Sequence, residues 1–237
     1  MLKKWKDLPD YMQNDAVRKY YDILYQKRGS LFLKRVFDIV VSFIMLVLLS
    51  PVFLILAIVI KCDSPGPVFF RQTRITQYGK TFRIFKFRTM VDNAEKLGTQ
   101  ITSKDDMRIT RIGHVIRKYR LDEICQLIDI FRGKMSFVGT RPEVPKFVDH
   151  YTEEMMATLL LPAGVTSEAS IYYKDEDRIL ESVEDMDKAY IENVLPDKMH
   201  YNLKSIEYFN FFNDIFIMLK TIRVIFSKNN MRNKRKI

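Results

Sequence analysis

Two adjacent acids, Asp122 and Glu123, lie in the stretch RKYRLDEICQL, directly after a cluster of bases. Neighbouring residues on a helix point about 100° apart, so the two carboxylates would line adjacent faces of a helix. Alone, such a pair is a common surface feature, whose ion pairs with nearby bases contribute roughly 0.2–0.5 kcal/mol each. The acids become candidates for chemistry because four cations lie near motif boundaries: Lys86, Arg88, Arg117 and Arg141.

These four cations form a set that suits a diphosphate. Lys86 and Arg88 would share one face of a strand, since side chains alternate between its two faces. That face is either a solvated basic surface or a pair of cations aimed at phosphate. Pro142 follows Arg141 and would hold it rigidly, and a guanidinium can bind phosphate through two hydrogen bonds.

The chain of 237 residues is long enough for one compact core with appendages. With 29% charged and 47% hydrophobic residues, it is neither a disordered tail nor a polytopic membrane protein. Its net charge of +10 predicts a polyanionic partner: nucleic acid, anionic lipid or a phosphorylated substrate. The three histidines are isolated and the two cysteines lie far apart, which gives no metal-ligand spacing and favours a reducing compartment.

The most apolar stretch, residues 36–60, contains a helix-breaking pair, Ser50 and Pro51, near its middle. As a straight helix it would rise roughly 37 Å, enough to span a bilayer with some tilt. However, lysines and arginines flank both of its ends, whereas a spanning helix usually has them on one side. We therefore favour a re-entrant hairpin over a kinked spanning helix. Its two arms, of about 14 and 10 residues, would enter and leave through one leaflet.

Two polar features of this stretch need partners. Pro51 cannot donate to the carbonyl of Val47, and the Ser50 hydroxyl is expected to satisfy that carbonyl. Asp38 is expected to pair with a nearby base or to lie at headgroup level, and the bases on offer are Lys34 and Arg35. The stretch begins late and has no small-residue cleavage site, so we do not expect a cleavable signal peptide.

Hydrophobic periodicity predicts an α+β fold around this stretch. We expect an amphipathic helix over residues 8–27, ending before Gly29, and a β-hairpin over residues 68–90. Helical spacing continues from 112 to 131. Residues 186–200 are expected to form a surface helix, and residues 206–226 an interfacial or core-packed one.

These elements divide the chain into five segments. They are an N-terminal amphipathic extension (1–33), the re-entrant membrane anchor (34–62), a small catalytic core (63–171), a C-terminal helical part (172–226) and a basic tail suited to anionic headgroups (227–237).

Five motifs occur in order between Lys34 and Ile171. They are KRVFDIV with LLSPVFLI, GPVFFRQTRI with FRIFKFRTM, RITRIG, RLDEICQLIDIFRGKMSFVGTRP and PAGVTSEASI. Any one of them is a weak signal. Together, in this order, they resemble the bacterial sugar transferase family, the monotopic phosphoglycosyl transferases that act on undecaprenyl phosphate.

The resemblance implies transfer of a sugar 1-phosphate from a UDP-sugar to undecaprenyl phosphate, with release of UMP. Asp122 would be the nucleophile and would form a covalent phosphosugar intermediate, and Glu123 would assist it or bind Mg²⁺ together with Asp122. Ser50 and Pro51 would form the hinge of the re-entrant helix. The four cations would position the diphosphate and the acceptor phosphate: Lys86, Arg88, Arg117 and Arg141.

The resemblance also implies a place and partners. The reaction would take place on the cytoplasmic face of the bacterial inner membrane, as the first membrane step of a surface glycan such as capsule, lipopolysaccharide or exopolysaccharide. Membrane lipids would be partners and nucleic acid would not. A homodimer is left open, as are the donor sugar and the glycan.

The chain departs from the family pattern at two places. Thr140 stands where the family has proline, in VGTRP, and is expected to loosen the turn before Arg141. Residues 163–167 read AGVTS in place of PGITG, which leaves the donor sugar open. The alternative function is a basic, membrane-tethered binding or scaffold protein without catalysis. Charge alone favours that alternative, but it does not explain why both acids lie in the most motif-dense stretch.

Overall fold

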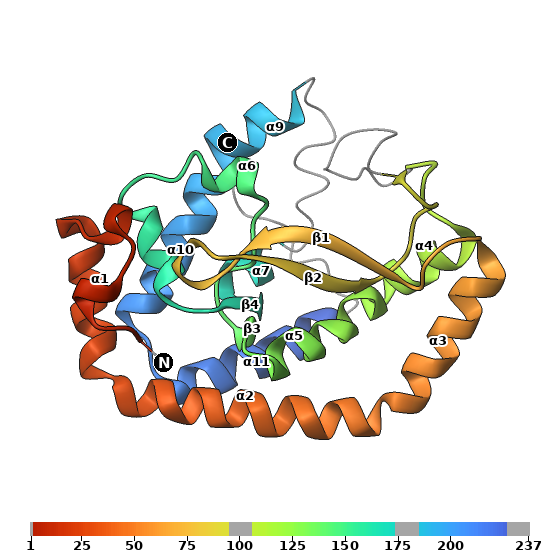
Figure 1. Cartoon of the computed structure of the whole chain (residues 1–237), viewed down its shortest axis with the longest axis horizontal. Helices are drawn as coiled ribbons and strands as arrows, with labels where there is room; N and C mark the ends of the chain where they lie inside the picture. Colours follow the sequence, from red (N-terminus) through yellow and green to blue (C-terminus); the bar gives the residue numbers. More distant parts are fainter. Residues whose placement is uncertain (1, 95–105, 174–184, 227–237) are drawn as a thin grey trace.

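The computed structural model describes residues 2–94, 106–173 and 185–226 and shows a mixed α+β fold (Figure 1). Within these residues the strands form two small sheets. In the first, β1 (Phe69–Ile75) pairs antiparallel with β2 (Thr81–Phe87). In the second, β3 (Met135–Val138) pairs in parallel with β4 (Ala163–Thr166). The predicted hairpin is confirmed, and Figure 1 shows it crossing the middle of the molecule above α2.

The N-terminal helix is shorter than predicted. Two 3-10 turns, Trp5–Asp7 and Asp10–Met12, precede α1 (Asp15–Gln26). The helix begins there because the Asn14 side chain accepts a hydrogen bond from the backbone N–H of Val17, as a good N-cap does. Gly29 does not lie beyond a helix end but in the first turn of the next helix. The predicted apolar side is buried in the core, so the tyrosines pack against the domain: Val17, Tyr20, Tyr21 and Leu24.

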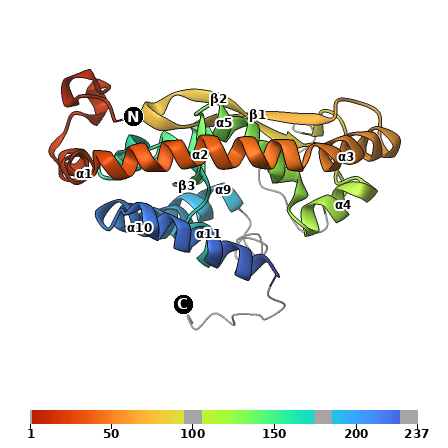
Figure 2. The same ribbon diagram turned by 90° about the horizontal axis from the view of Figure 1, so that it is seen from below.

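The apolar stretch folds as two helices, α2 (Arg28–Leu48) and α3 (Ser50–Asp63), bent by 60° at the break. Figure 1 shows α3 turning upward from the end of α2, and Figure 2 shows the two helices end to end along the molecule. The Ser50 hydroxyl donates to the carbonyl of Val47 at 2.8 Å, which is the bond that the sequence predicts. Among the described residues, no single helix has the length and apolar composition to cross a membrane, although this bent pair meets that test when taken together.

An exposed apolar surface runs along the outside of α2 and continues onto α11 (Phe211–Phe226). On α2 it includes Val36, Val40, Phe43, Ile44 and Val47, and on α11 it includes Phe212, Phe216, Leu219 and Ile222. The two helices meet where the rings of Phe37 and Phe211 lie 5.7 Å apart. A continuous apolar area of this kind marks an interaction surface for protein or membrane.

Polar side chains of α2 fix it to β3 and to α11. The Lys34 ammonium donates to the carbonyl of Val138 at 2.8 Å and to Asp214 at 2.6 Å. Asp38 accepts a hydrogen bond from the backbone N–H of Phe137 at 3.2 Å. The prediction of an ion pair between Asp38 and Lys34 or Arg35 is therefore wrong, because Lys34 pairs with α11 and Arg35 donates to the carbonyl of Ile130.

The helical pattern from 112 to 131 is not one helix. It is divided into α4 (Arg111–Lys118), a 3-10 turn (Leu121–Gln126) and α5 (Leu127–Phe131). The division lies at Arg120, whose φ of 52° is in the left-handed region and cannot continue a right-handed helix. Asp122 and Glu123 therefore lie in a tight turn, and the turn is packed against β2.

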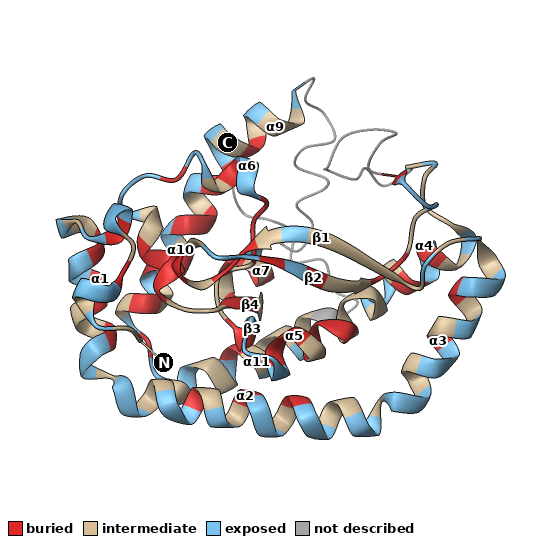
Figure 3. Ribbon diagram, viewed as in Figure 1, coloured by how far each residue is buried: buried red, intermediate tan, exposed pale blue. Residues whose placement is uncertain are grey.

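The remaining described helices complete the domain. They are α6 (Pro145–Val148), a 3-10 turn (Met155–Leu160), α7 (Glu168–Tyr172), α9 (Met186–Ala189), a π turn (Tyr190–Val194) and α10 (Leu195–Glu207). Residues 186–200 are predicted to lie at the surface, but Tyr190, Leu195 and Met199 are buried in the core cluster that also contains α1 side chains. Figure 3 shows buried positions along α10, which lies beside α1. The predicted basic tail, 227–237, lies outside the described residues.

Candidate active site

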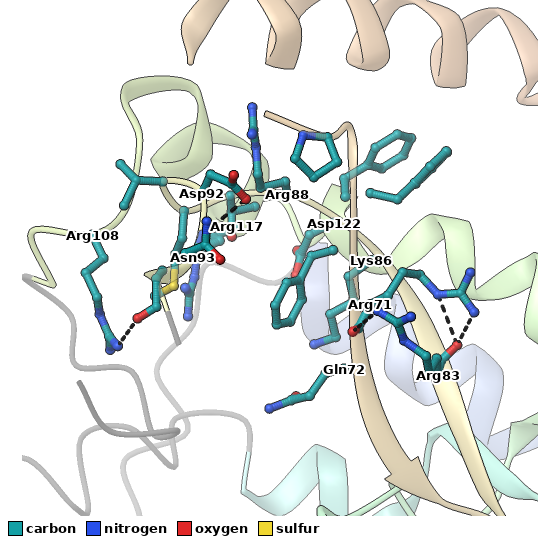
Figure 4. A pocket seen from close by; sticks show the side chains of 18 of the residues that line it. Arg71, Gln72, Arg83, Lys86, Arg88, Asp92, Asn93, Arg108, Arg117 and Asp122 are labelled. Atoms are coloured by element: carbon teal, nitrogen blue, oxygen red, sulfur yellow. Dashed lines mark hydrogen bonds between the residues drawn. The ribbon is translucent and has the colours of Figure 1, made fainter. Parts of the chain in front are cut away.

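A cavity of about 520 Å³ opens beside the hairpin, within the size range of small-molecule sites (Figure 4). Its walls come from β1, β2, residues 88–94 and the start of the 3-10 turn. Lys86, Arg88, Arg117 and Asp122 all line it. In the view of Figure 4, Asp122 and Lys86 lie in the middle, with Arg117 to one side and Arg71 and Arg83 to the other.

The two acids face different partners. Asp122 lines the cavity, and within the described residues no other side chain makes a hydrogen bond or ion pair with its carboxylate. Glu123 accepts a hydrogen bond from the Lys86 ammonium at 3.2 Å and forms an ion pair with Arg141. The left-handed residue Arg120 makes this possible, because the turn that follows it directs successive side chains differently from a straight helix. Asp122 is therefore the carboxylate that is available to a ligand.

The charges around the pair push the two carboxyl pKa values apart. Burial raises the pKa of Asp122, and the nearby Glu123 charge adds to this, outweighing the opposing effect of Lys86 and Arg117. Burial would also raise the pKa of Glu123, but the Arg141 and Lys86 charges overcome it and hold that pKa well below its usual value. Burial lowers the pKa of Lys86. Carboxyls separated in this way are typical of sites where two acids have different roles.

The backbone on both sides of Arg141 is fixed by hydrogen bonds to the carbonyls of Thr140 and Pro142. Arg74 donates to the carbonyl of Pro142 at 3.0 Å, and the same guanidinium makes two hydrogen bonds to the Gln72 side chain. The carbonyl of Thr140 accepts a hydrogen bond from the Gly164 N–H at 2.8 Å, which extends the β3–β4 pairing. That Thr140 loosens this turn relative to proline stays a prediction, since the carbonyl at this position can accept the same hydrogen bond with either side chain.

The other two predicted cations have different surroundings. The Arg88 guanidinium is buried and donates to the carbonyls of Ser64 and Pro65, both at 2.7 Å. It thus fixes the loop after α3 at the wall of the cavity, and does not form a pair with Lys86. Arg117 also lines the cavity, and within the described residues its side chain makes no hydrogen bond or ion pair. Three of the predicted cations therefore lie near the two acids: Lys86, Arg117 and Arg141. Arg88 instead holds the loop after α3 in place.

Two supporting residues were missed by the motif reasoning, Arg74 and Glu143. Arg74 shares a strand face with Gln72, and the strand register places Lys86 on that face too. The alternation of side chains along the two strands could therefore have predicted that Arg74 lies on the same side of the hairpin as Lys86. Glu143 is buried and accepts hydrogen bonds from Tyr190 at 2.6 Å and Lys198 at 3.3 Å. No local pattern predicts that network, because its members lie far apart in the sequence.

The donor atoms allow a test of whether Mg²⁺ fits. Within residues 2–94, 106–173 and 185–226 there is no group of three or more potential metal-ligating side chains. Mg²⁺ is commonly held by one or two carboxylates together with substrate phosphates. Asp122 fits that requirement, whereas the Glu123 oxygens are engaged by Lys86 and Arg141. The site thus fits a magnesium ion that arrives with a diphosphate and is held by Asp122.

The chain matches a known protein family over most of its length. The model of the bacterial sugar transferase family matches residues 29–228, which include the bent helix pair, the hairpin and the acid pair. The chain belongs to the bacterial sugar transferase family. The chain is 38% identical over 200 residues to the UDP-N-acetylgalactosamine-undecaprenyl-phosphate N-acetylgalactosaminephosphotransferase of Aeromonas hydrophila, covering 82% of this chain and 44% of that protein.

Two further relatives of the chain have names with other sugars. The UDP-glucose:undecaprenyl-phosphate glucose-1-phosphate transferase of Escherichia coli is 38% identical, over 67% of this chain and 36% of its own length. The undecaprenyl-phosphate galactose phosphotransferase of Salmonella typhimurium is 30% identical, over 86% and 42%. The matched part thus spans less than half the length of each of these three relatives.

Proposed function

We propose that this protein transfers a sugar 1-phosphate from a UDP-sugar to undecaprenyl phosphate and releases UMP. The observation that carries the proposal is the division of roles within the acid pair. Glu123 is neutralised by Lys86 and Arg141, while Asp122 is left facing the cavity between cations. The names of the three relatives agree with it, since each contains undecaprenyl phosphate as well as a transferred sugar phosphate.

The first half-reaction uses Asp122 as the nucleophile. Its carboxylate oxygen attacks the β-phosphorus of the UDP-sugar, the bond from that phosphorus to the bridging oxygen breaks, and UMP leaves with the bridging oxygen. The sugar phosphate is then bonded to Asp122 as an acyl phosphate. Arg117 and Lys86 lie where they can balance the charge of the diphosphate, and the pairing with Glu123 orients the Lys86 ammonium.

The second half-reaction regenerates the enzyme. A phosphate oxygen of undecaprenyl phosphate attacks the same phosphorus, and the bond to the Asp122 oxygen breaks. The product is the lipid diphosphate sugar, and the carboxylate returns to its starting state. Two successive displacements at one phosphorus predict ping-pong kinetics. Mg²⁺ held by Asp122 and the diphosphate would neutralise phosphate charge during binding.

We further propose that α2 and α3 form a re-entrant hairpin in the cytoplasmic leaflet of the bacterial inner membrane, with the active site on the cytoplasmic side. The 60° bend and the Ser50–Val47 hydrogen bond support this, because a break in lipid requires its freed carbonyl to be satisfied. The apolar outer surface of α2 and α11 supports it as well. The hinge at Ser50 and Pro51 would then set the depth of the hairpin and the height of the cavity above the lipid.

Cys62 offers a direct test of this topology, because it is exposed at the end of α3 while Cys125 is buried. We expect a membrane-impermeant maleimide to label Cys62 in inverted inner-membrane vesicles and to leave it unlabelled in intact cells with a permeabilised outer membrane. A Cys62→Ser variant is the blank. Cysteine placed at the exposed position Gln26, in the Cys62→Ser background, reports the N-terminal side. Labelling of the two cysteines from opposite sides would indicate a spanning helix and reject the hairpin.

The reaction is tested by nucleotide release. Purified full-length protein in detergent would be given undecaprenyl phosphate, Mg²⁺ and a panel comprising UDP-N-acetylgalactosamine, UDP-glucose and UDP-galactose. UMP release that requires both the lipid and one of these donors is the expected result. UDP as the product would indicate sugar transfer without phosphate. Tight binding of undecaprenyl phosphate without any nucleotide release, across a wider donor panel, would favour the non-catalytic binding or scaffold role.

A further inference from the structure

Three arginines gather around Phe85 on the face of the hairpin opposite Lys86. The strand register puts Arg71 directly across from Phe85, and Arg83 lies two residues before Phe85 on the same face. The Arg71 guanidinium lies 3.4 Å from the centre of the Phe85 ring, and that of Arg132, at the end of α5, lies 5.6 Å from it. We call Arg71, Arg83 and Arg132 the arginine cluster.

The arginine cluster has an excess of positive charge. Its nearest carboxylate, Asp129, is buried and accepts a hydrogen bond from the backbone N–H of Phe85 at 2.8 Å. Arg71 and Arg83 each donate to the other's backbone carbonyl, which positions them without neutralising them. The Arg132 guanidinium makes no hydrogen bond or ion pair with any residue that the structure describes; only the backbone N–H of this residue donates, to the carbonyl of Ile128 at 3.0 Å. Three guanidiniums beside one carboxylate leave two charges for an anion to balance.

The arginine cluster lies next to the apolar surface of α2. The residue before Arg132 is Phe131, whose ring lies 6.0 Å from that of Phe43 in α2, and Phe43 is 55% exposed. The carbonyl of Phe131 also accepts a hydrogen bond from Arg35 of α2 at 3.0 Å. If the apolar surface of α2 lies in lipid, Arg132 is therefore at the level of the headgroups.

The arginine cluster is also continuous with the candidate active site. Arg71 and Arg83 line the same cavity as Asp122 (Figure 4). Two aromatic side chains of the hairpin face, Phe69 and Phe87, stack 5.3 Å apart and lead from the cluster toward α3. A path of cations thus runs from the headgroup level of α2 to the cavity wall.

We propose that the arginine cluster binds the phosphate of the lipid acceptor and directs it to the phosphosugar on Asp122. The proposal rests on the proposed function and names the part of the site that takes the second substrate. Guanidiniums bind phosphate through paired, charge-assisted hydrogen bonds, so a phosphomonoester with about two negative charges matches the charge excess. Lys86, on the opposite face of the hairpin from the arginine cluster, is left for the donor diphosphate together with Arg117 and Arg141.

The two half-reactions provide the test. In neutral detergent micelles, Arg132→Gln is expected to raise the KM for undecaprenyl phosphate about tenfold, and Arg132→Glu more than that. The single equivalent of UMP released from the UDP-sugar without acceptor should keep the wild-type rate, because Arg132 lies on the acceptor side. Lys134→Gln, which removes an exposed charge two residues away, is the matched control and should leave the KM unchanged. Arg71→Gln is a second variant for the same measurement of the KM for undecaprenyl phosphate. Its melting temperature is measured alongside to check that the variant is folded.

A binding measurement tests the role of the arginine cluster independently of whether the protein carries out the proposed reaction. In the Asp122→Asn background, adding Arg132→Gln is expected to weaken retention of undecaprenyl phosphate about tenfold, whether or not the protein is an enzyme. An unchanged acceptor KM, or an equal fall in the donor-only UMP release, would overturn the proposal. Equal weakening of phosphatidylglycerol binding would also overturn it, since the arginine cluster would then be a general surface for anionic lipids.

Discussion

Replacing Asp122 by asparagine is expected to abolish UMP release, with kcat falling by about 10³-fold or more. Asparagine keeps the size and most of the polarity of the side chain but cannot form the acyl phosphate. The neighbouring charges from Lys86 and Arg117 remain, so donor binding should persist. The measurement is nucleotide release from the active UDP-sugar, together with the stoichiometric UMP release in the absence of lipid acceptor.

The same variant should be at least as stable as the wild-type protein at pH 7. Burial raises the pKa of Asp122 in the folded state. Stability linked to such a group is present below the unfolded pKa and is lost as the pH rises through the folded pKa. At neutral pH the ionised side chain therefore costs stability, which the neutral asparagine recovers. A lower melting temperature for Asp122→Asn at pH 7 would contradict this electrostatic account.

The raised pKa of Asp122 also predicts the acid side of the activity profile. Only the ionised carboxylate attacks phosphorus, so donor kcat/KM should fall as the pH drops through the folded pKa of Asp122. Because that pKa is raised, the fall should occur at a higher pH than an ordinary aspartate would give. Loss of activity only at the ordinary value or below would argue for a different nucleophile.

Replacing Glu123 by glutamine is expected to impair both folding and catalysis. The change leaves Lys86 without its ion-pair partner among the described residues and weakens the hold on Arg141. We expect the free energy of unfolding to fall by about 2 kcal/mol, less than for a fully buried pair because Arg141 is 33% exposed. Activity should fall by about 10², since both cations are displaced from their positions beside Asp122.

The pH dependence of stability identifies the cause of the Glu123→Gln effect. The Arg141 and Lys86 charges hold the pKa of Glu123 low in the folded state, so its stabilisation is present above the unfolded pKa and is lost as the pH falls through the folded pKa. The stability difference between wild type and variant should therefore shrink in acid. A difference that stays constant with pH would indicate a packing defect, not loss of an ion pair.

Two further variants separate the effect of Glu123 on activity, through the positions of Lys86 and Arg141, from its effect on the stability of the fold. Glu153→Gln removes a carboxylate that is exposed on the surface, and should change neither the free energy of unfolding nor the activity. Adding Lys86→Met to Glu123→Gln removes the unpaired ammonium and should restore part of the stability without restoring activity. Recovery of activity in the double variant would show that Lys86 and Glu123 serve only to fold the turn.

Local patterns in the sequence predicted the elements that local interactions form. The alternation along residues 68–90 predicted the hairpin, because strand geometry places every second side chain on one face. The Ser50 and Pro51 pair predicted both the helix break and the hydrogen bond to Val47, since a proline always removes one donor from a helix. The apolar side of α1 was also predicted, although its first turn was placed too early.

Tertiary structure decided which partners the polar side chains take. Lys86 and Arg88 have the expected spacing, yet one pairs with Glu123 and the other with the loop after α3, because those elements pack against different parts of the hairpin. Asp38 takes a backbone N–H of β3 for the same reason. Partner choice depends on segments that are distant in sequence, and no periodicity carries that information.

The order of the sequence motifs, together with the apolar stretch broken at Ser50 and Pro51, was sufficient to predict the sugar transferase family. It also singled out Asp122 and Glu123 as the candidate catalytic acids. The difference between the acids came only from the fold. A left-handed residue at Arg120 turns Asp122 toward the cavity, and Arg141, carried there by the β3–β4 pairing, neutralises Glu123. Burial then separates their pKa values, since the free energy of a buried charge depends on the charges that the fold brings next to it.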